Sequence, residues 1–228
     1  MMALMNDVRH TNKECVVLLH GLGRSARSMW RLARFFRVRG YAVLCKTYPS
    51  RRHTIESLAE QVFSEIFRDE RIKQCEKVHF VTHSLGGVLL RRWFQVKGRS
   101  ERIGRVVMLG VPNQGSEVTD FFRHWPLYQW LTGPAGCQLG TGEGDVPKML
   151  KTINLEIGVI AGTRSADPWF NFLFDGEHDG KVSVSSARLA EMADFITLDV
   201  GHTLMMWDKE VIQQAGHFIQ KGHFLLVE

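Results

Sequence analysis

The sequence predicts a single-domain α/β fold, with about six mostly parallel strands and helices on both faces of the sheet. Short apolar runs alternate along the chain with longer segments whose apolar residues recur at helical spacing. This alternation is typical of βαβ units, in which a helix returns the chain so that successive strands run parallel. The chain has 228 residues, of which 44% are hydrophobic, enough for a sizeable core. We therefore expect residues 1–228 to form one domain.

Six short apolar runs are predicted as strands. The first, CVVLLH, ends directly before a glycine, and the third, KVHFVT, leads into a tight polar turn. The six predicted strands are residues 15–20, 41–48, 77–82, 105–111, 156–162 and 194–200. The carboxyl ends of parallel strands share one edge of a sheet, where ligands bind. Functional residues are therefore expected at that edge.

Amphipathic segments with recognisable caps are predicted as the helices between these strands. Ser28 is expected to cap a helix that stops at Gly40, and Thr54 to cap the next helix. Residues 85–97 form a third predicted helix directly after the third strand, and Asp208 is expected to cap the last helix. These helices supply the two layers that cover a parallel sheet.

Residues 112–153 interrupt this alternation. The segment is rich in aromatic residues, glycine and proline, and it is longer than an ordinary connection between secondary-structure elements. We expect it to leave the sheet and to pass over the strand ends as a short cap or lid.

Composition argues against several classes of protein. No apolar run reaches the roughly 18 residues of a membrane span, and the first residues lack the apolar core of a signal peptide. A cytoplasmic protein without stable membrane insertion is expected. The four cysteines show no metal-binding spacing, so we expect reduced thiols and no metal site.

The net charge of +5 raises the question of nucleic-acid binding. In the basic segment GRSARSMWRLARFFRVRG, apolar residues from Met29 to Phe36 recur at helical spacing, so the arginines fall largely on the opposite face. A solvated helix face explains this pattern. No nucleic-acid partner is therefore predicted. A weak attraction to anionic surfaces is left open, and so is the oligomeric state.

Ser84 lies in the turn THSLGG between the third strand and the third helix. It fits two interpretations: an ordinary N-cap serine, or a nucleophile that a strained turn exposes above the sheet. In the second, the backbone N–H of Leu85 points toward an oxyanion formed at Ser84. Thr82 stands where the familiar G-x-S-x-G pattern has glycine. The turn alone does not decide between the two.

Loops at other strand ends carry the groups that a serine nucleophile needs. The segment HGLG after the first strand offers the backbone N–H of Leu22 as a second oxyanion donor, and His20 is expected to brace this loop. His202 follows the last strand, where a base could reach the serine. Asp179, in a glycine-flanked loop before it, is a candidate for the acceptor that holds the base in one tautomer.

Five segments together resemble small bacterial lipase/esterase-like serine hydrolases of the α/β-hydrolase superfamily. In chain order they are VVLLHGLG, VHFVTHSLGG, VVMLGVPNQGSEVTD, DGKVSVSSA and GHTLMM. The resemblance covers residues 15–219 and implies an α/β-hydrolase fold. Residues 1–14 leave no room for the two usual leading strands, so we expect a minimal version of that fold. It also implies that Ser84 is the nucleophile, Asp179 the acid and His202 the base, with the two oxyanion donors named above. The order Ser, Asp, His along the chain is the one that such hydrolases use.

The acid has two further candidates. Asp167 comes just after the fifth predicted strand, and Asp175 lies close to the same loop. Asp179 is favoured because its D-G-x-V context matches the resemblance. Thr82 departs from the family pattern, and we interpret it as a packing change at the turn.

Aromatic residues near the expected cap are candidates for an acyl pocket. Phe121, Phe122, Trp125 and Phe170 are predicted to bind substrate. The other interpretation of these side chains is a small satellite cluster under a long loop.

The expected activity is cleavage of a small-molecule carboxylic ester through an acyl-enzyme, with no cofactor. One alternative is an acyltransferase, thioesterase or amidase that uses the same three residues. In that case Gln114 or Arg24 would hold a second nucleophile or a head group. The other alternative is a catalytically silent hydrolase fold that serves as a binding module.

Overall fold

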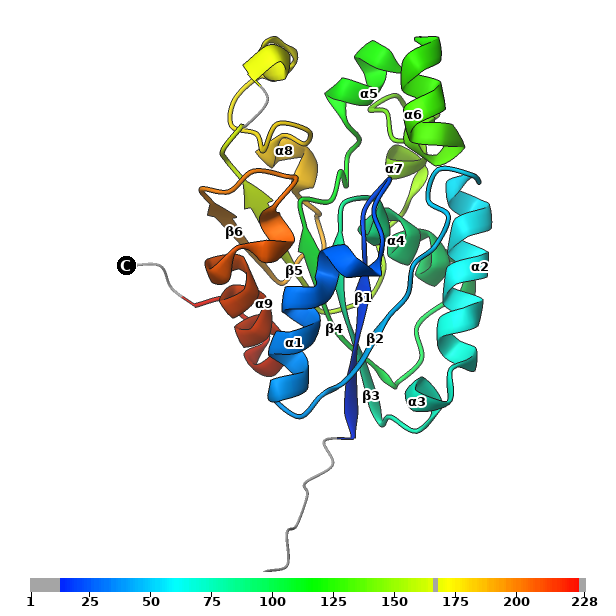
Figure 1. Ribbon diagram of the computed structural model, residues 1–228, viewed down its shortest axis with the longest axis vertical. Helices are drawn as coiled ribbons and strands as arrows, with labels where there is room; N and C mark the ends of the chain where they lie inside the picture. The colour runs from blue at the N-terminus through cyan, green and yellow to red at the C-terminus, as the bar shows by residue number, and fades with distance from the viewer. Residues whose placement is uncertain (1–12, 166–167, 226–228) are drawn as a thin grey trace, which may run out of the picture.

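The computed structural model describes residues 13–165 and 168–225. Its centre is a six-stranded sheet in the order β2-β1-β3-β4-β5-β6 (Figure 1). The strands are β1 Glu14–Leu19, β2 Ala42–Cys45, β3 Lys77–His83, β4 Ile103–Leu109, β5 Ile157–Gly162 and β6 Asp194–Leu198. All five pairings are parallel, which confirms the predicted sheet.

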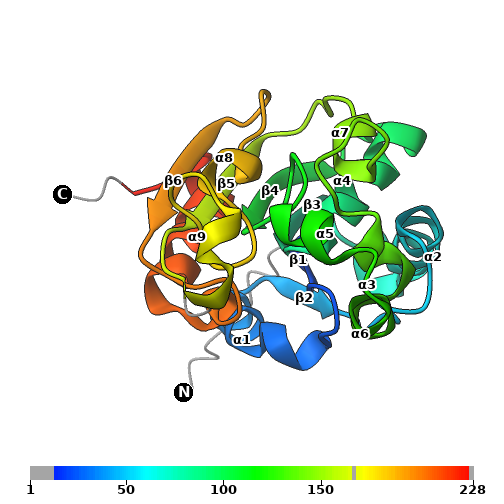
Figure 2. The ribbon, with the colours of Figure 1, turned by 90° about the horizontal axis from the view of Figure 1, so that it is seen from above.

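Helices cover both faces of the sheet (Figure 1). The helices are η1 Ala26–Met29, α1 Trp30–Val38, α2 Ile55–Arg68, α3 Glu70–Lys73, α4 Leu85–Lys97, α5 Glu117–Phe122, α6 Pro126–Cys137, α7 Val146–Met149, η2 Pro168–Leu173, α8 Val184–Ala187, η3 Met205–Trp207 and α9 Lys209–Lys221. α1 and α9 pack on one face, and α2 and α4 pack on the other. The view from above shows the two layers on either side of the strands (Figure 2).

Alternate residues of β1 supply both apolar layers, because successive side chains of a strand point to opposite faces. Cys15, Val17 and Leu19 join the core under α2 and α4. Val16 and Leu18 join the core under α1 and α9. A strand that is buried on both faces has to be apolar throughout, which is why this run carried so clear a signal in the sequence.

Two of the three predicted helix caps are present, and one is wrong. The Thr54 hydroxyl accepts the backbone N–H of Ser57, and the Asp208 carboxylate accepts two N–H groups at the start of α9. Ser28, however, lies inside η1, because the chain already turns at Ser25. Both the backbone N–H and the hydroxyl of Ser28 donate to the Ser25 carbonyl, so Ser28 cannot cap α1.

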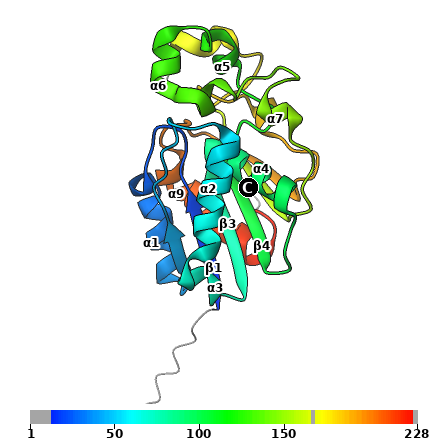
Figure 3. The same cartoon turned by 90° about the vertical axis from the view of Figure 1, so that its right-hand side faces the viewer.

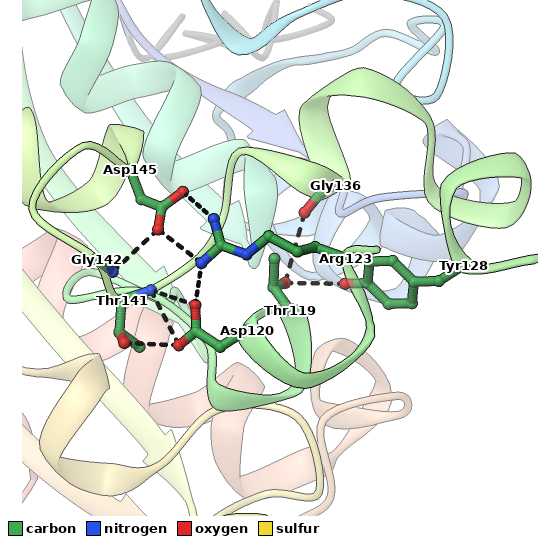
Figure 4. A network of polar contacts seen from close by, with 8 residues as sticks. All are labelled: Thr119, Asp120, Arg123, Tyr128, Gly136, Thr141, Gly142 and Asp145. Atoms are coloured by element: carbon green, nitrogen blue, oxygen red, sulfur yellow. Dashed lines mark hydrogen bonds and ion pairs between the residues drawn. The ribbon is translucent and has the colours of Figure 1, made fainter. Parts of the chain in front are cut away.

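The connection between β4 and β5 contains α5, α6 and α7, which lie beyond the C-terminal ends of the strands (Figure 1, Figure 3). An ionic network holds this segment together (Figure 4). The Arg123 guanidinium forms two hydrogen bonds, of 2.8 and 2.9 Å, with Asp145, and it also contacts Asp120. Asp120 in turn accepts the backbone N–H and the hydroxyl of Thr141.

No helix in the described part of the chain is both long enough and apolar enough to cross a membrane.

Candidate active site

Ser84 occupies a strained turn between β3 and α4. Its φ of 51° is the only positive φ of a non-glycine residue among the described residues. Such a conformation costs about 1–3 kcal/mol, so the surrounding structure must hold it. The Ser84 backbone N–H donates to the carbonyl of Leu109 at 3.0 Å, which ties the turn to the end of β4. The Ser84 side chain makes no capping hydrogen bond, so the hydroxyl is not used as an ordinary N-cap.

Glycines let α4 begin this close to the sheet. A Cβ on Gly86 would lie 2.9 Å from the His20 carbonyl oxygen, and a Cβ on Gly87 would lie 2.8 Å from a methyl of Val111. Neither position accepts a side chain without displacing its neighbours, which at Gly86 include backbone atoms. Thr82, in contrast, is fully buried and fits beside Gly87, with its hydroxyl 3.4 Å from the Val107 carbonyl oxygen. The packing around the turn therefore accommodates threonine at the position where the sequence pattern has glycine.

His202 and Asp179 form a hydrogen-bonded chain with Ser84. His202 Nε2 lies 3.1 Å from Ser84 Oγ, and His202 Nδ1 lies 2.7 Å from Asp179 Oδ2. Since a carboxylate only accepts, the proton sits on Nδ1 and the Nε2 lone pair faces the serine. All three side chains are buried. This arrangement allows His202 to take the Ser84 proton while Asp179 stabilises the cation that forms.

Hydrogen bonds from backbone N–H groups to Asp179 hold the loop around this residue. Asp179 Oδ1 accepts the backbone N–H groups of Lys181 and Val182, and the Asp179 carbonyl accepts the N–H of His202. Asp175 is exposed, and no contact joins it to His202. Asp167 lies outside the described residues. Of the two acid candidates that the structure describes, only Asp179 reaches His202.

Two glycines that sequence reasoning missed make room for this pair. Gly110, at the end of β4, has a φ of 53°, and a Cβ there would lie 2.9 Å from Asp179 Oδ2 and 3.1 Å from His202 Nδ1. A Cβ on Gly162, at the end of β5, would lie 2.8 Å from the Asp179 Cβ. A glycine within the last two residues of a predicted strand was the signal that could have found both.

His83 is a further residue that sequence reasoning did not use. It is buried beside the site, and its Nε2–H donates to the His202 carbonyl at 3.0 Å, which helps to hold the His202 loop. Burial lowers the pKa of His83 well below its usual value, so the ring is neutral. Its Nδ1 therefore carries a lone pair, and that atom has no hydrogen-bond partner among the described residues.

His20 braces the loop after β1, as the sequence predicted. Its Nδ1–H donates to the Gly21 carbonyl at 2.8 Å, and its Nε2 accepts the backbone N–H of Tyr48 at 3.2 Å. The Tyr48 ring stacks on the imidazole, and its hydroxyl donates to the His20 carbonyl. Burial lowers the pKa of His20, which keeps the imidazole neutral. The residue thus supports the loop that carries Leu22.

A cavity of about 220 Å³ opens onto Ser84 and His202. Leu22 lines it on one side, and Thr119 and Tyr128 of the β4–β5 connection line it on another. The Thr119 and Tyr128 hydroxyls form a 2.8 Å hydrogen bond with each other, which joins α5 to α6 beside the cavity (Figure 4). The wall therefore combines strand-end loops with the 112–153 segment.

The predicted acyl-pocket residues are not brought to Ser84. Phe121, Phe122, Trp125 and Phe170 do not line the cavity; they pack against one another, with ring centroids 4.7–6.2 Å apart. Two of them reach the wall indirectly: Phe122 stacks on Tyr128, and the Lys181 ammonium lies 6.0 Å from the centre of the Phe170 ring. The second interpretation, a small satellite cluster, therefore describes these rings, because the aromatic side chains on these short helices pack against one another.

In the part of the chain that the structure describes, no three His, Cys, Asp or Glu side chains are grouped so that they could hold a metal ion.

A parallel sheet with a serine at a strained strand–helix turn, and a histidine and an aspartate on later loops, is the architecture of an α/β hydrolase. Residues 16–219 match the Alpha/beta hydrolase family, and the chain belongs to this family. A comparison with curated proteins finds no significant match.

Solved structures of lipases and esterases share the fold. The mature form of Bacillus licheniformis lipase BlEst2 has a TM-score of 0.69 and 20% sequence identity, over 92% of each chain. Legionella pneumophila phospholipase PlaB has a TM-score of 0.70 and 15% identity, over 90% of this chain and 57% of its own. The metagenomic carboxyl esterase MGS0156 has a TM-score of 0.67 and 17% identity, over 84% of this chain and 65% of its own.

The present chain thus spans less than two thirds of the length of PlaB and of MGS0156. It also spans 47% of the propeptide form of BlEst2. At these identities the likeness concerns the fold.

Proposed function

We propose that this protein is a serine hydrolase that cleaves carboxylic esters through an acyl-enzyme. The observation that carries the proposal is the continuous chain of hydrogen bonds from Ser84 Oγ through His202 to Asp179, with distances of 3.1 and 2.7 Å. A serine hydroxyl becomes a useful nucleophile only when a base accepts its proton, and the base acts well only when a third group orients it. The lipase and esterase names among the structural neighbours agree with this chemistry.

The reaction has two halves. In the first, Ser84 Oγ attacks the ester carbonyl as its proton moves to His202 Nε2, and His202 then protonates the leaving alcohol. In the second, His202 takes a proton from water, the water oxygen attacks the acyl carbonyl, and the proton returns to Ser84 as the carboxylic acid leaves. Asp179 stays ionised throughout and stabilises the imidazolium of His202.

The backbone N–H groups of Leu22 and Leu85 are the proposed oxyanion donors. Leu22 lies in the wall of the cavity, and Leu85 is the first residue of α4, where N–H groups have no partner within the helix. Neither N–H donates a turn hydrogen bond to another described residue. In the best-studied hydrolase, the loss of one such donor costs about 2.7–4 kcal/mol of transition-state stabilisation.

The cavity favours small acyl groups. Its volume of about 220 Å³ is below the roughly 300–1,000 Å³ that is typical of sites for drug-sized ligands. We expect the rate on p-nitrophenyl esters to be highest for the acetyl and butyryl esters and to fall for the lauroyl ester. A maximum at the lauroyl ester would show that the 112–153 segment opens to admit long chains.

Labelling with a fluorophosphonate tests the nucleophile and separates an enzyme from a silent binding module. The probe should label the wild-type protein and should not label Ser84→Ala. Ser116→Ala is the matched control, because Ser116 also lines the cavity but its hydroxyl donates to the Lys181 carbonyl. Equal labelling of the wild type and of Ser84→Ala would refute the assignment.

The acyltransferase alternative differs only in the group that receives the acyl chain. Gln114 does not line the cavity, and its side-chain amide donates to the Arg188 carbonyl, whereas Arg24 lines the wall. Products formed from a p-nitrophenyl ester in the presence of a primary alcohol distinguish the two reactions. We expect the free acid to dominate over the new ester.

A further inference from the structure

Arg24 connects the Ser84 cavity to a second, smaller cavity. It lines the first beside Leu22, and it also lines a neighbouring cavity of about 140 Å³ whose wall includes Ser50, Arg51 and Arg52. The loops after β1 and β2 lie side by side here, because the Gly23 N–H donates to Ser50 Oγ at 2.9 Å. A substrate bound at Ser84 would therefore have this second cavity as its neighbour.

The charge of Arg24 is not balanced by any carboxylate among the described residues. The side chain is half-buried, and no ion pair or hydrogen bond joins it to another described residue. Partial burial lowers the pKa of its guanidinium, and its charge lowers the pKa of the nearby His20 and His83. A desolvated cation without a partner is unfavourable unless an anion occupies the space beside it.

The surrounding residues add to this positive charge. Residues 15–55 contain eight arginines, one lysine and no Asp or Glu. Arg52 also has no carboxylate partner among the described residues, and Arg51 only approaches the Leu131 carbonyl at 3.5 Å. Among the described residues that line the two cavities, there is no acidic side chain.

A hydroxyl completes the donor set. Ser50 Oγ accepts the Gly23 N–H and donates to no described residue, so its own proton is available to a ligand. Guanidinium groups match the geometry of phosphate oxygens and bind them with two parallel hydrogen bonds. Three guanidinium groups and one hydroxyl around one small cavity suit a group with several acceptor oxygens and more than one negative charge.

We propose that Arg24, Arg51, Arg52 and Ser50 form an anion subsite that holds a phosphate group carried by the ester substrate. The proposal rests on the proposed function, because it makes the substrate of Ser84 a phosphate-bearing acyl ester. The phosphate belongs either to a small soluble molecule that carries both a carboxylic ester and a phosphate monoester, or to the head group of a lipid. The subsite would hold the phosphate oxygens in the same way in both cases.

A binding experiment tests the subsite without requiring turnover. Isothermal titration of Ser84→Ala with sn-glycerol 3-phosphate should show binding at low ionic strength. Adding Arg24→Gln or Arg52→Gln should weaken it by about tenfold or more, because charge-assisted hydrogen bonds are lost. Arg34→Gln on the exposed side of α1 is the matched control and should change it less than about twofold. Succinate, as a carboxylate probe, should bind more weakly than the phosphate ester.

A kinetic experiment on the active protein tests whether a phosphate group on the ester increases its rate of cleavage. The ratio of kcat/KM for 1-butyryl-glycerol 3-phosphate to that for 1-butyryl-glycerol should exceed one and should fall by about tenfold in Arg24→Gln and in Arg52→Gln. Co-sedimentation with phosphatidylglycerol vesicles, compared with phosphatidylcholine vesicles, identifies the source. Binding to the anionic vesicles that is lost in both variants supports a lipid head group, and a response to the soluble ester alone supports a soluble substrate.

Two outcomes overturn the subsite: no binding of either phosphate source, or equal effects of Arg34→Gln and of the two subsite variants. Failure of the proposed function has a different signature, because fluorophosphonate labelling at Ser84 would be absent while phosphate binding to the arginines remained.

Discussion

The strand-end loops and the 112–153 segment build the same cavity by different physical means. Ser84, Asp179 and His202 stand on loops that leave a parallel sheet buried on both faces. The 112–153 segment is instead joined by an ionic network centred on Arg123 (Figure 4). It also leaves several large apolar side chains exposed. Trp130, for example, is 76% exposed.

The difference separates the part of the protein that sets the chemistry from the part that sets access to it. Close-packed apolar side chains hold backbone positions to within fractions of an ångström, which a proton relay needs. Charged networks near the surface are weaker and respond to salt. Substitutions in the strand-end loops should therefore change kcat, and substitutions in the segment should change KM and local stability.

The largest effect is expected for Asp179→Asn. The amide cannot stabilise the imidazolium of His202 and favours the wrong tautomer, so kcat should fall by about 10⁴-fold. Rates on p-nitrophenyl butyrate measure it, with Asp175→Asn as the matched control near wild-type rate. A similar loss in Asp167→Asn alone, with Asp179→Asn unaffected, would move the acid to that position.

Gly110→Ala should break the strand-end geometry without removing a reacting group. The added Cβ meets Asp179 Oδ2 and His202 Nδ1 in a backbone conformation that side chains rarely adopt. Displacing the pair by about an ångström should lower kcat by about 100-fold and leave KM nearly unchanged. Gly144→Ala is the control, because a Cβ there meets no atom within 4 Å. Full activity of Gly110→Ala would mean that the relay tolerates movement.

Acid should weaken the sheet region. Burial lowers the pKa of His20, His79 and His83, so these rings stay neutral in the folded protein. In the unfolded chain their pKa returns to about 6.5, and the unfolded state then binds more protons below that pH. The free energy of unfolding should therefore fall as the pH drops below about 6.5, by up to about 1.4 kcal/mol per pH unit for each histidine.

Urea unfolding at pH 7.5 and at pH 5.5 measures this slope. The variant His83→Gln keeps an N–H donor for the His202 carbonyl but has no titrating ring, so its slope should be smaller. An unchanged slope would show that His83 does not contribute to the acid sensitivity.

Arg123→Gln should loosen the 112–153 segment. Hydrogen bonds to Asp145 and, less strongly, to Asp120 raise the pKa of Arg123, and all three side chains are no more than a third exposed. Their loss should lower the free energy of unfolding by about 1–2 kcal/mol, and it should raise KM more than it lowers kcat. Arg71→Gln, which removes an exposed pair with Asp69, is the matched control.

Salt sharpens the same contrast. Concentrated NaCl should raise KM in the wild type and have less effect in Arg123→Gln, because the network that salt screens is already broken. If kcat rather than KM responded to Arg123→Gln, the division between the two regions would be wrong.

The smallest effect is expected for Thr82→Gly. The substitution restores the pattern glycine, removes a buried side chain and makes the strand more flexible, so unfolding should become easier by about 1 kcal/mol. The kcat should stay within about twofold of wild type, because Gly86 and Gly87 already set the distance between α4 and the sheet. Thermal unfolding together with ester turnover checks both parts, and a large loss of kcat would give Thr82 a role in the turn itself.

The sequence by itself determined the parallel sheet, because strands buried on both faces must be apolar throughout. It also predicted the positions of Ser84, Asp179 and His202, since parallel strands end at one edge and loops there converge whatever the details of packing. Helix caps such as Thr54 and Asp208 were equally local and were predicted correctly. Ser28 was not, because the chain turned three residues earlier than its apolar pattern indicated.

Only the tertiary structure decided which groups meet. The distance between Asp179 and His202 depends on the close approach that Gly110 and Gly162 permit. The contact between His83 and the His202 carbonyl joins residues 119 positions apart. The sequence left open whether the aromatic side chains of the 112–153 segment face Ser84 or one another. In the folded protein, Phe122 packs against Phe121 and Trp125. Local spacing predicts which face or edge a residue occupies, whereas contacts between distant segments depend on how all the elements pack at once.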